Sequence, residues 1–411
     1  MKKYVIIGNG TAAAGCIEGI RSVDTESPIT VVSKENHPVY CRPLISYYLE
    51  GKASPEKMNY RPADFYSSNG CSVIYGVTAE KIDPKERKVV LSDGTELPYT
   101  SVCVAAGSSP FLPAFEGLET VKNQFRFMTL DDAEALEHAV NESSRVLIIG
   151  AGLIGLKCAE GLTGRVGSIT VCDLADRVMS SVLDTDAASV VQKHLEEHGM
   201  KFLLSESVLR FDGNTAVMKS GKTVDFDILV TAVGVRANVS LVSGIGGTVG
   251  RGITVDTSMR TDIDGVFAAG DCTEGYDLTV GKNRVLALMP NAYMQGHAAG
   301  VNMAGGNEIF DKGIPMNSIG FFGLHVMTAG NCTGECISAE DESCSKRRFF
   351  IEDGFLNGFI FVGDTTRAGI FTSLIRNKVR LDEIDFGLLV KTSSFTAFSQ
   401  KNRGKMFGGV V

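Results

Sequence analysis

The residues of this chain whose spacing fits nucleotide chemistry lie in two glycine-rich segments. Residues 4–13 read YVIIGNGTAA, and residues 146–155 read VLIIGAGLIG. In each segment an apolar strand runs into a glycine turn that opens a helix, and the N–H groups of such a turn bind a pyrophosphate. An acid follows near the end of the next apolar strand, Glu35 in the first case and Asp173 in the second. Because such an acid accepts hydrogen bonds from ribose hydroxyls, the two segments predict two bound dinucleotides.

The elements predicted around the two turns repeat along the chain. Each copy is expected to hold a buried strand, the glycine turn, a helix, a second strand, a β-meander and a last strand that ends in a glycine turn. The copies are in register, since Gly94 matches Gly221 and Gly107 matches Gly234, each 127 residues further on. We interpret this as the internal duplication of a whole domain. The expected segments are 4–7, 11–22, 29–32, 71–97 and 102–110, and then 146–163, 169–172, 201–225 and 226–236.

The predicted fold class is α/β, with two Rossmann-like dinucleotide-binding domains that carry β-meanders and a C-terminal α+β domain. The connection between the copies contains a capping-box helix at 130–141. After residue 240, a short strand ends in Gly270-Asp271. A helix follows at 291–304, and we expect its small residues to pack closely on a sheet or on a cofactor. From residue 311 the sequence pattern predicts short strands separated by turns, expected at 320–323, 348–351 and 358–362.

Composition excludes several classes of protein. The chain has 411 residues, of which 44% are hydrophobic, enough for two or three domains. The net charge of −8 argues against nucleic acid as the main partner. No apolar run is long enough to span a bilayer, and no signal peptide precedes the first strand, so we expect a soluble, cytoplasmic protein. Residues 345–411 hold 11 Lys and Arg against 6 Asp and Glu, which predicts a solvated surface or a docking face for an acidic partner.

The ten cysteines are scattered, mostly in apolar runs that read as core positions in a reducing compartment. Cys332, Cys336 and Cys344 form one cluster, but three thiols without a fourth ligand make a poor zinc or iron–sulfur site. The histidines form no catalytic constellation. We therefore expect no metal.

Jointly and in order, the motifs resemble the FAD- and NAD(P)H-dependent pyridine nucleotide–disulfide oxidoreductase superfamily. The resemblance covers about residues 1–305 and rests on both glycine turns, on Ala-Gly-Ser at 106–108, on Ala-Val-Gly at 232–234 and on Ala-Gly-Asp at 269–271. The segments 38–43 (PVYCRP) and 290–296 (PNAYMQG) and the C-terminal part resemble NADH:rubredoxin reductases, the flavin module of nitrite reductase and ferredoxin reductases.

The resemblance implies two cofactors, FAD in the first fold and NADH in the second, with hydride passing from the nicotinamide to the flavin. For FAD it implies Gly8, Gly10, Thr11, Ala12, Ala13, Glu35, Arg42, Pro43, Val77, Ala106, Gly107, Gly270, Asp271 and Pro290. For NADH it implies Gly150, Gly152, Leu153, Ile154, Gly155, Asp173, Val233 and Gly234. Because Asp173 would repel a 2′-phosphate and no arginine directly follows it, we predict NADH over NADPH.

Two positions depart from the family pattern and are our candidate catalytic residues. The disulfide reductases carry Cys-x4-Cys near the flavin, whereas this chain has Cys41 and then Ser46. Cys41 is therefore either a redox thiol or a bystander beside the flavin loop. Lys157 occupies a position where relatives usually have Glu. It is either a surface lysine or a cation in the cleft between the cofactors that favours anionic reduced flavin.

The function that these features predict is an NADH-dependent flavoprotein reductase. Its acceptor would be a small redox protein such as rubredoxin, or an iron–sulfur subunit, and the chain would act as a homodimer or within a larger complex. An oxidase or peroxidase that uses Cys41 and a redox-sensing NADH-binding flavoprotein are the alternatives. The expected domains are 1–112 with 241–310 for FAD, 113–240 for NADH, and 311–411 as an interface domain.

Overall fold

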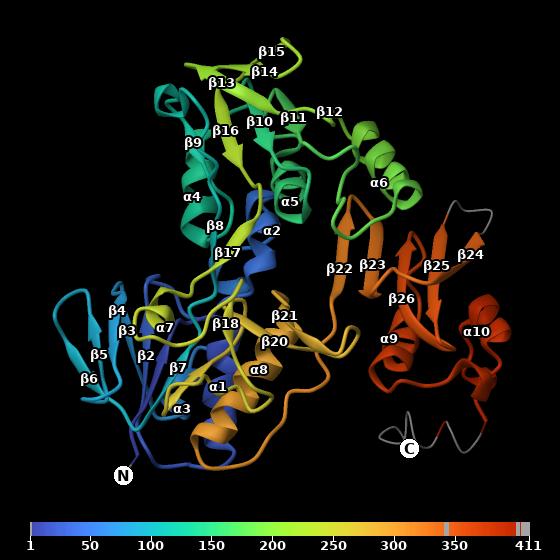
Figure 1. Cartoon of the computed structure of the whole chain (residues 1–411). Helices are drawn as coiled ribbons and strands as arrows, with labels where there is room; N and C mark the ends of the chain where they lie inside the picture. Colours follow the sequence, from blue (N-terminus) through green and yellow to red (C-terminus); the bar gives the residue numbers. More distant parts are fainter. Residues whose placement is uncertain (1, 341–344, 400–402, 404–411) are drawn as a thin grey trace. The chain divides into compact units, whose positions relative to one another are not determined.

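The computed structural model describes residues 2–340, 345–399 and 403. The chain forms two compact units, each assembled from segments that are not contiguous in sequence (Figure 1). Unit 1 comprises Met1–Pro113, Phe125–Ala139 and Ala232–Gly313, and unit 2 comprises Ala114–Gln124, Val140–Thr231 and Ile314–Val411.

Unit 1 is built on a five-stranded sheet in the order β19-β7-β1-β2-β3, in which every neighbouring pair is parallel. Its inner strands are almost entirely apolar and buried, as expected where helices cover both faces of a parallel sheet. The carboxyl ends of parallel strands lie along one edge, where such folds bind their ligands. The strands are β1 (Tyr4–Ile7), β2 (Ile29–Ser33), β3 (Cys71–Tyr75), β7 (Ser101–Val104) and β19 (Val266–Ala268).

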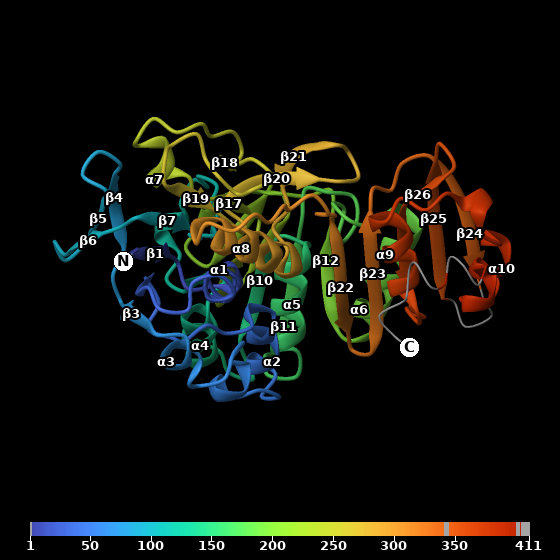
Figure 2. The same ribbon diagram turned by 90° about the horizontal axis from the view of Figure 1, so that it is seen from below.

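Helices α1 (Thr11–Arg21) and α8 (Met289–Met303) lie side by side in unit 1 (Figures 1 and 2). Glycines line both sides of the crossing: a Cβ on Gly296 would come within 2.0 Å of the Ala12 carbonyl oxygen, and one on Gly15 within 2.4 Å of the Tyr293 carbonyl oxygen. The small residues of α8 were expected to face a sheet or a cofactor. They face another helix instead, because glycine on both partners allows the backbones to touch.

Helix α4 (Leu130–Ala139) begins with the predicted capping box. The Thr129 N–H donates to Asp132 Oδ2 at 2.9 Å, and the Asp132 N–H donates to Thr129 Oγ1 at 3.0 Å. The remaining elements of unit 1 are η1 (Arg42–Leu44), α2 (Ile45–Leu49), η2 (Pro55–Met58), α3 (Phe65–Ser68), β4 (Ala79–Asp83), β5 (Lys88–Leu91), β6 (Glu96–Pro98), β8 (Ser108–Pro110), β17 (Val235–Ala237), α7 (Ser240–Ser243), β18 (Ile253–Thr254), β20 (Thr273–Asp277) and β21 (Lys282–Val285).

The first half of unit 2 repeats the architecture around a second sheet, in the order β12-β11-β10-β16-β9. Four of its five strands, β12, β11, β10 and β16, pair in parallel. The elements are η3 (Leu118–Thr120), β9 (Gln124–Phe125), β10 (Arg145–Ile149), α5 (Leu153–Leu162), β11 (Ser168–Cys172), α6 (Thr185–Glu197), β12 (Met200–Leu203), β13 (Val208–Asp212), β14 (Thr215–Met218), β15 (Thr223–Asp225) and β16 (Ile228–Thr231).

The second half of unit 2 is the predicted α+β domain, an antiparallel sheet in the order β22-β23-β26-β25-β24 with α9 packed on it (Figure 1). Phenylalanines of β25, β26 and α9 form its aromatic core. The elements are β22 (Met316–Phe321), β23 (Leu324–Gly330), β24 (Glu335–Glu340), β25 (Lys346–Glu352), β26 (Phe355–Val362), α9 (Ala368–Arg376), η4 (Leu381–Glu383), α10 (Phe386–Thr392) and η5 (Phe395–Ala397).

The predicted fold class is confirmed, and three details of the prediction are wrong. The first strand assigned to each meander, β3 and β12, instead extends its parallel sheet; an apolar run does not reveal which sheet it joins. Helix α6 was not predicted, although Asp184 caps it by accepting the Ala187 N–H at 2.9 Å. Residues 320–323 were predicted as a strand, but Phe322-Gly323 is the turn between β22 and β23.

Candidate functional site

The first glycine turn leaves β1 and opens α1. Gly8 has φ +110°, and a Cβ there would come within 2.1 Å of the Ala105 carbonyl oxygen, so only glycine fits. A Cβ on Gly10 would meet nothing within 4 Å, which leaves space above the turn for a ligand. The first bond within the helix runs from the Ala14 N–H to the Gly10 carbonyl, and no side chain caps the helix. The first-turn N–H groups therefore point into this space without a partner in the helix.

The second glycine turn has the same geometry. Gly150 has φ +113°, and a Cβ on Gly152 would also meet nothing within 4 Å. Helix α5 starts at Leu153 without a side-chain cap or an acid in its first turn, and Ile154 and Gly155 complete that turn. Such a helix N-terminus favours an anion such as a pyrophosphate. Both turns thus fit the dinucleotides that the sequence predicted for them.

The predicted FAD residues of unit 1 gather at the carboxyl ends of its parallel strands. All five strands contribute, since each runs out into a predicted residue or segment within a few positions of its end. The Gly8 N–H donates to the Val32 carbonyl at 2.8 Å, and the Val77 N–H donates to the Ser33 carbonyl at 3.2 Å, which joins the turns after β1, β2 and β3. The residues that follow the strands are Gly8 after β1, Glu35 after β2, Val77 after β3, Ala106 and Gly107 after β7, and Gly270 and Asp271 after β19.

Glu35 is held by two neighbours. Its Oε1 is paired with the Arg42 guanidinium, and its Oε2 accepts the Tyr40 hydroxyl at 2.6 Å. The Tyr40 oxygen also accepts the Leu130 N–H at 3.0 Å, so it links this acid to the start of α4. A carboxylate oxygen accepts more than one hydrogen bond, and Glu35 can still accept from a ribose.

Arg42 interacts electrostatically with both of the acids predicted to contact FAD. Burial alone would lower the pKa of this guanidinium, but its acidic neighbours outweigh burial and raise the pKa above the ordinary arginine value. These neighbours are Tyr40, Glu35 and Asp271. Burial raises the pKa of Asp271, against the opposing effects of Arg42 and Ser108. A cation that is paired with Glu35 and also feels the charge of Asp271 suits an anionic ligand such as a pyrophosphate.

Two polar residues of this site were not predicted individually. Tyr40 stands in the PVYCRP segment and Gln295 in the PNAYMQG segment, so the motifs signalled both without giving them roles. Gln295 is 1% exposed, and its Oε1 accepts the Gly270 N–H at 2.8 Å and the Thr273 hydroxyl at 3.0 Å. It therefore fixes the Gly-Asp turn that presents Asp271. Pro290 lies in the first turn of the same helix, α8.

Asp173 is held by the backbone around the second turn. Its Oδ2 accepts the Ala151 N–H at 2.6 Å, and its Oδ1 accepts the Ala175 N–H at 2.8 Å. Arg177, the nearest following cation, is occupied: its Nε donates to the Leu183 carbonyl at 3.1 Å, and its Nη1 is 2.8 Å from Asp176 Oδ1. The predicted residues Val233 and Gly234 follow β16 but belong to unit 1.

Cys41 is half-buried at the start of η1, directly before Arg42 and Pro43. Burial raises the pKa of its thiol, and this effect outweighs a backbone hydrogen bond from Leu44 that lowers the pKa. A raised pKa lowers the fraction of thiolate, the form that reacts with peroxides and disulfides. This environment favours the bystander interpretation of Cys41 over the redox interpretation.

Lys157 is not a surface lysine, because only 14% of its side chain is exposed. Its ammonium is paired with Glu160 on the same helix and donates to the Gly320 carbonyl at 3.2 Å. Both partners belong to unit 2. Of the two interpretations of Lys157, the surface one is wrong.

In the part of the chain that the structure describes, no group of three or more His, Cys, Asp and Glu residues could hold a metal ion. Cys332 and Cys336 are exposed, and Cys344 lies outside the described residues. No helix among the described residues is long and apolar enough to cross a bilayer.

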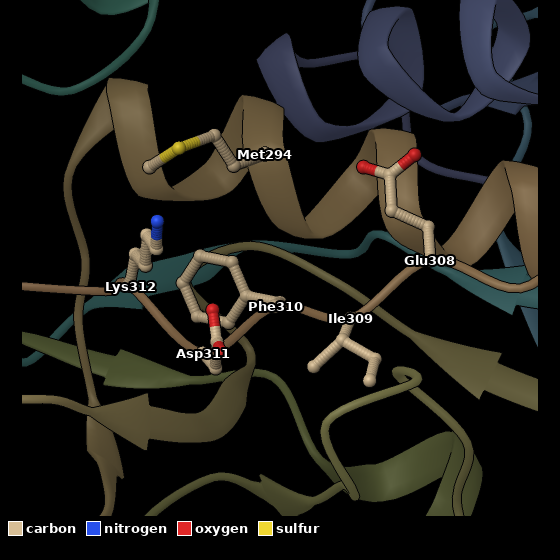
Figure 3. Close-up of a pocket in the computed structure, with 6 residues that line it drawn as sticks. All are labelled: Met294, Glu308, Ile309, Phe310, Asp311 and Lys312. Atoms are coloured by element: carbon tan, nitrogen blue, oxygen red, sulfur yellow. The ribbon is translucent and has the colours of Figure 1, made fainter. Parts of the chain in front are cut away.

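A pocket of about 370 Å³ lies elsewhere in unit 1, between α8 and the segment that follows it (Figure 3). Glu308, one of its lining residues, is paired with His297 at 2.9 Å. None of the lining residues belongs to the predicted cofactor set. They are Met294, Glu308, Ile309, Phe310, Asp311 and Lys312.

The chain belongs to the pyridine nucleotide-disulphide oxidoreductase family, whose profile matches residues 2–296. The epsilon subunit of NADH-dependent phenylglyoxylate dehydrogenase from Aromatoleum evansii is 30% identical over 391 residues, which are 92% of this chain and 92% of that protein. An NADH oxidase from Methanocaldococcus jannaschii is 33% identical over 315 residues, 74% of this chain and 70% of that protein. The chain is thus an oxidoreductase of a family that uses FAD and NAD(P)H, as predicted.

A solved structure supports the fold over almost the whole length. The covalent putidaredoxin reductase–putidaredoxin complex matches with a TM-score of 0.87 over 95% of this chain and 96% of that chain, at 23% identity. This match includes the C-terminal domain, which lies beyond the family profile.

Proposed function

We propose that this chain is an FAD-dependent NADH oxidoreductase that delivers electrons to a protein acceptor, as a subunit or a docking partner. The observation that carries the proposal is the pair of matched glycine turns, each with open space over its glycine and uncapped helix N–H groups. One chain with two such turns binds two dinucleotides. When bound, FAD accepts hydride from NADH and passes electrons on.

Different parts of the chain would bind the two dinucleotides. We propose that residues 1–112 and 241–310 hold FAD, with Arg42 facing the pyrophosphate, Glu35 the adenosine ribose and Asp271 the ribityl hydroxyls. Residues 113–240 would hold NADH, with Asp173 at its ribose. Little acid–base chemistry is needed, because the contribution of the protein is to align two rings and exclude water.

The preference for NADH over NADPH has electrostatic support. Among the residues that the structure describes, Asp173 accepts hydrogen bonds from the Ala151 and Ala175 backbone amides and forms no ion pair with a side-chain cation. Arg177 is held by Asp176 and by loop carbonyls. A 2′-phosphate would therefore meet an anion without a matching cation.

A protein acceptor is supported by the relative that spans 92% of the chain, which is itself a subunit of an NADH-dependent dehydrogenase. We propose residues 311–411 as the interface domain. Three arginines of its basic stretch, Arg347, Arg348 and Arg380, are already paired with acids of this chain at 2.8 Å, which leaves them less available to an acidic partner. We also propose a cytoplasmic location, since the nine described cysteines are free, as in a reducing compartment.

The test is anaerobic reduction of the purified flavoprotein. NADH should bleach the flavin absorbance, and a rubredoxin, a ferredoxin or a co-purifying iron–sulfur subunit should restore it. Bleaching that only oxygen or peroxide reverses would favour an NADH oxidase, the activity named for the relative from Methanocaldococcus jannaschii. Cys41→Ser would then decide whether that activity uses the thiol. Slow reoxidation by every acceptor would favour a redox sensor.

A further inference from the structure

The turn between β22 and β23 is strained. Phe322 has φ +46°, in the left-handed region that bulky side chains rarely adopt. Such a conformation is unfavourable for a bulky residue and persists only where the surroundings enforce it. The following residue, Gly323, takes the left-handed conformation without this cost. The contacts that hold Phe322 therefore indicate what the strain serves.

Helix α5, which the second glycine turn opens, supplies the first set of contacts. The Phe322 N–H donates to Glu160 Oε1 at 2.7 Å. The other oxygen of Glu160 is paired with Lys157, whose ammonium also donates to the Gly320 carbonyl at 3.2 Å. Glu160 is 5% exposed. One buried ion pair on α5 thus holds the turn on its β22 side, through the Gly320 carbonyl and the Phe322 N–H.

Helix α6 holds the turn from a second side. The ring of His198 stacks on that of Phe322, with centroids 4.2 Å apart and an interplanar angle of 4°. His194 Nε2 lies 3.0 Å from the Phe321 carbonyl oxygen. The two histidines are one helical turn apart, and the His194 carbonyl lies 2.7 Å from His198 Nδ1. Two helices of the dinucleotide fold therefore enforce the strained turn of the C-terminal sheet.

We propose that Lys157 and Glu160 are positioning residues for NADH, because they fix α5 against the C-terminal turn. This inference rests on the proposed function, in which the N-terminus of α5 binds the NADH pyrophosphate. Helix α5 has only ten residues, and Lys157 stands about 6 Å along it from its first residue at 1.5 Å per residue. A displacement at the turn would shift the first-turn N–H groups that bind the phosphates. A partner that changed the C-terminal domain would then change NADH affinity.

The structure disfavours a direct electrostatic effect of Lys157 on the flavin. The carboxylate of Glu160 neutralises the ammonium, and the pair as a whole is uncharged. The field of such a pair falls off faster with distance than that of a lone charge. Position rather than charge is therefore the property that Lys157 contributes.

Two variants test the inference by different routes. Phe322→Gly relieves the strain and removes the ring without altering α5. The double variant Lys157→Met with Glu160→Gln removes both charges together, so no buried charge is left unpaired. Each should raise the Kd for NADH about fivefold or more, the low end of typical coupling between linked sites. FAD content and the flavin midpoint potential should match the wild type.

Asp353→Gly is the matched control for the turn. Asp353 also has a positive φ, +52°, at the β25–β26 hairpin of the same sheet. Relieving that strain should leave the Kd for NADH unchanged. Lys193→Met, which removes an exposed cation from α6, is the control for charge and should also leave the Kd unchanged.

Two results would overturn the inference. Unchanged NADH affinity in both test variants, with a lower melting temperature, would make the contact purely structural. A shifted flavin potential in the double variant, with unchanged Kd, would assign Lys157 an electrostatic role. The proposed function is tested separately by the wild-type titration, since wild-type protein that fails to bind NADH refutes that function whatever the variants do.

Discussion

The two dinucleotide-binding turns share one backbone but differ in how the acid after each is held. Gly8 and Gly150 have φ values of +110° and +113°, and the helices that follow them, α1 and α5, both lack a side-chain cap. Glu35, however, is paired with a guanidinium and a phenol, whereas Asp173 accepts from two backbone amides. In the proposed function, the duplicated backbone would set where each dinucleotide lies, and the side chains that differ would set the charge that it meets.

The largest expected effect comes from filling the open space over one turn at a time. Gly10 and Gly152 have extended backbones that any residue adopts, so Gly10→Val and Gly152→Val should both fold. Gly10→Val should lower FAD affinity at least tenfold, which corresponds to about 1.4 kcal/mol, and Gly152→Val should do the same for NADH. Flavin content and NADH titration measure the two separately. Gly10→Val protein that retained full flavin would contradict the assignment.

Removing the guanidinium should have the next largest effect, confined to the first turn. Arg42→Met leaves Glu35 without its cation and removes the positive charge that interacts with both acids. FAD affinity should fall by about tenfold, since a charge-assisted bond contributes ~1.5–3 kcal/mol. The measurement is flavin release during dialysis, with Arg177→Met as the matched control on the second turn. Equal flavin loss in both variants would erase the distinction between the turns.

An effect of similar size, confined to the second turn, is expected from reversing the charge at the proposed site of the second ribose. Leu174→Arg together with Asp173→Ser should shift the ratio of kcat/KM for NADPH over NADH upward by about tenfold, through a new phosphate contact and a lost repulsion. Steady-state kinetics with both coenzymes measures this shift. An unchanged ratio would mean that the adenosine ribose lies elsewhere. The FAD content should not change, because these residues belong to the other turn.

The smallest effect concerns stability without cofactor. Burial raises the pKa of Asp271, so the fold disfavours its carboxylate form. The free energy of unfolding therefore falls as the pH rises from the ordinary aspartate pKa through the raised one. Asp271→Asn should therefore raise the melting temperature of the apoprotein at neutral pH. This gain should disappear once the pH falls below the ordinary aspartate pKa. Thermal unfolding at both pH values measures it, and a gain that persisted in acid would refute the explanation.

Sequence reasoning was strongest where the local pattern fixes the local structure. The strand–glycine–helix segments, the capping box of α4 and the strand before Gly270-Asp271 lie where predicted, because caps and periodicity act over a few residues. It was weakest for partners distant in the chain. Strands β3 and β12 were assigned to the wrong sheets, because the sequence of an apolar strand does not indicate which strand it pairs with. For the same reason Tyr40 and Gln295 were quoted within motifs but given no contacts.

The sequence by itself determined the family, the α/β class and the two nucleotide turns. Glycine spacing and strand hydrophobicity are local patterns, so a short segment of sequence is enough to reveal them. Only the tertiary structure decided which charges meet. It pairs Glu35 with Arg42, occupies Arg177 with Asp176, and turns Lys157 toward Glu160 and the strained Phe322 turn. Lys157 and the Gly320 carbonyl are 163 residues apart in sequence, so no local pattern could reveal their contact.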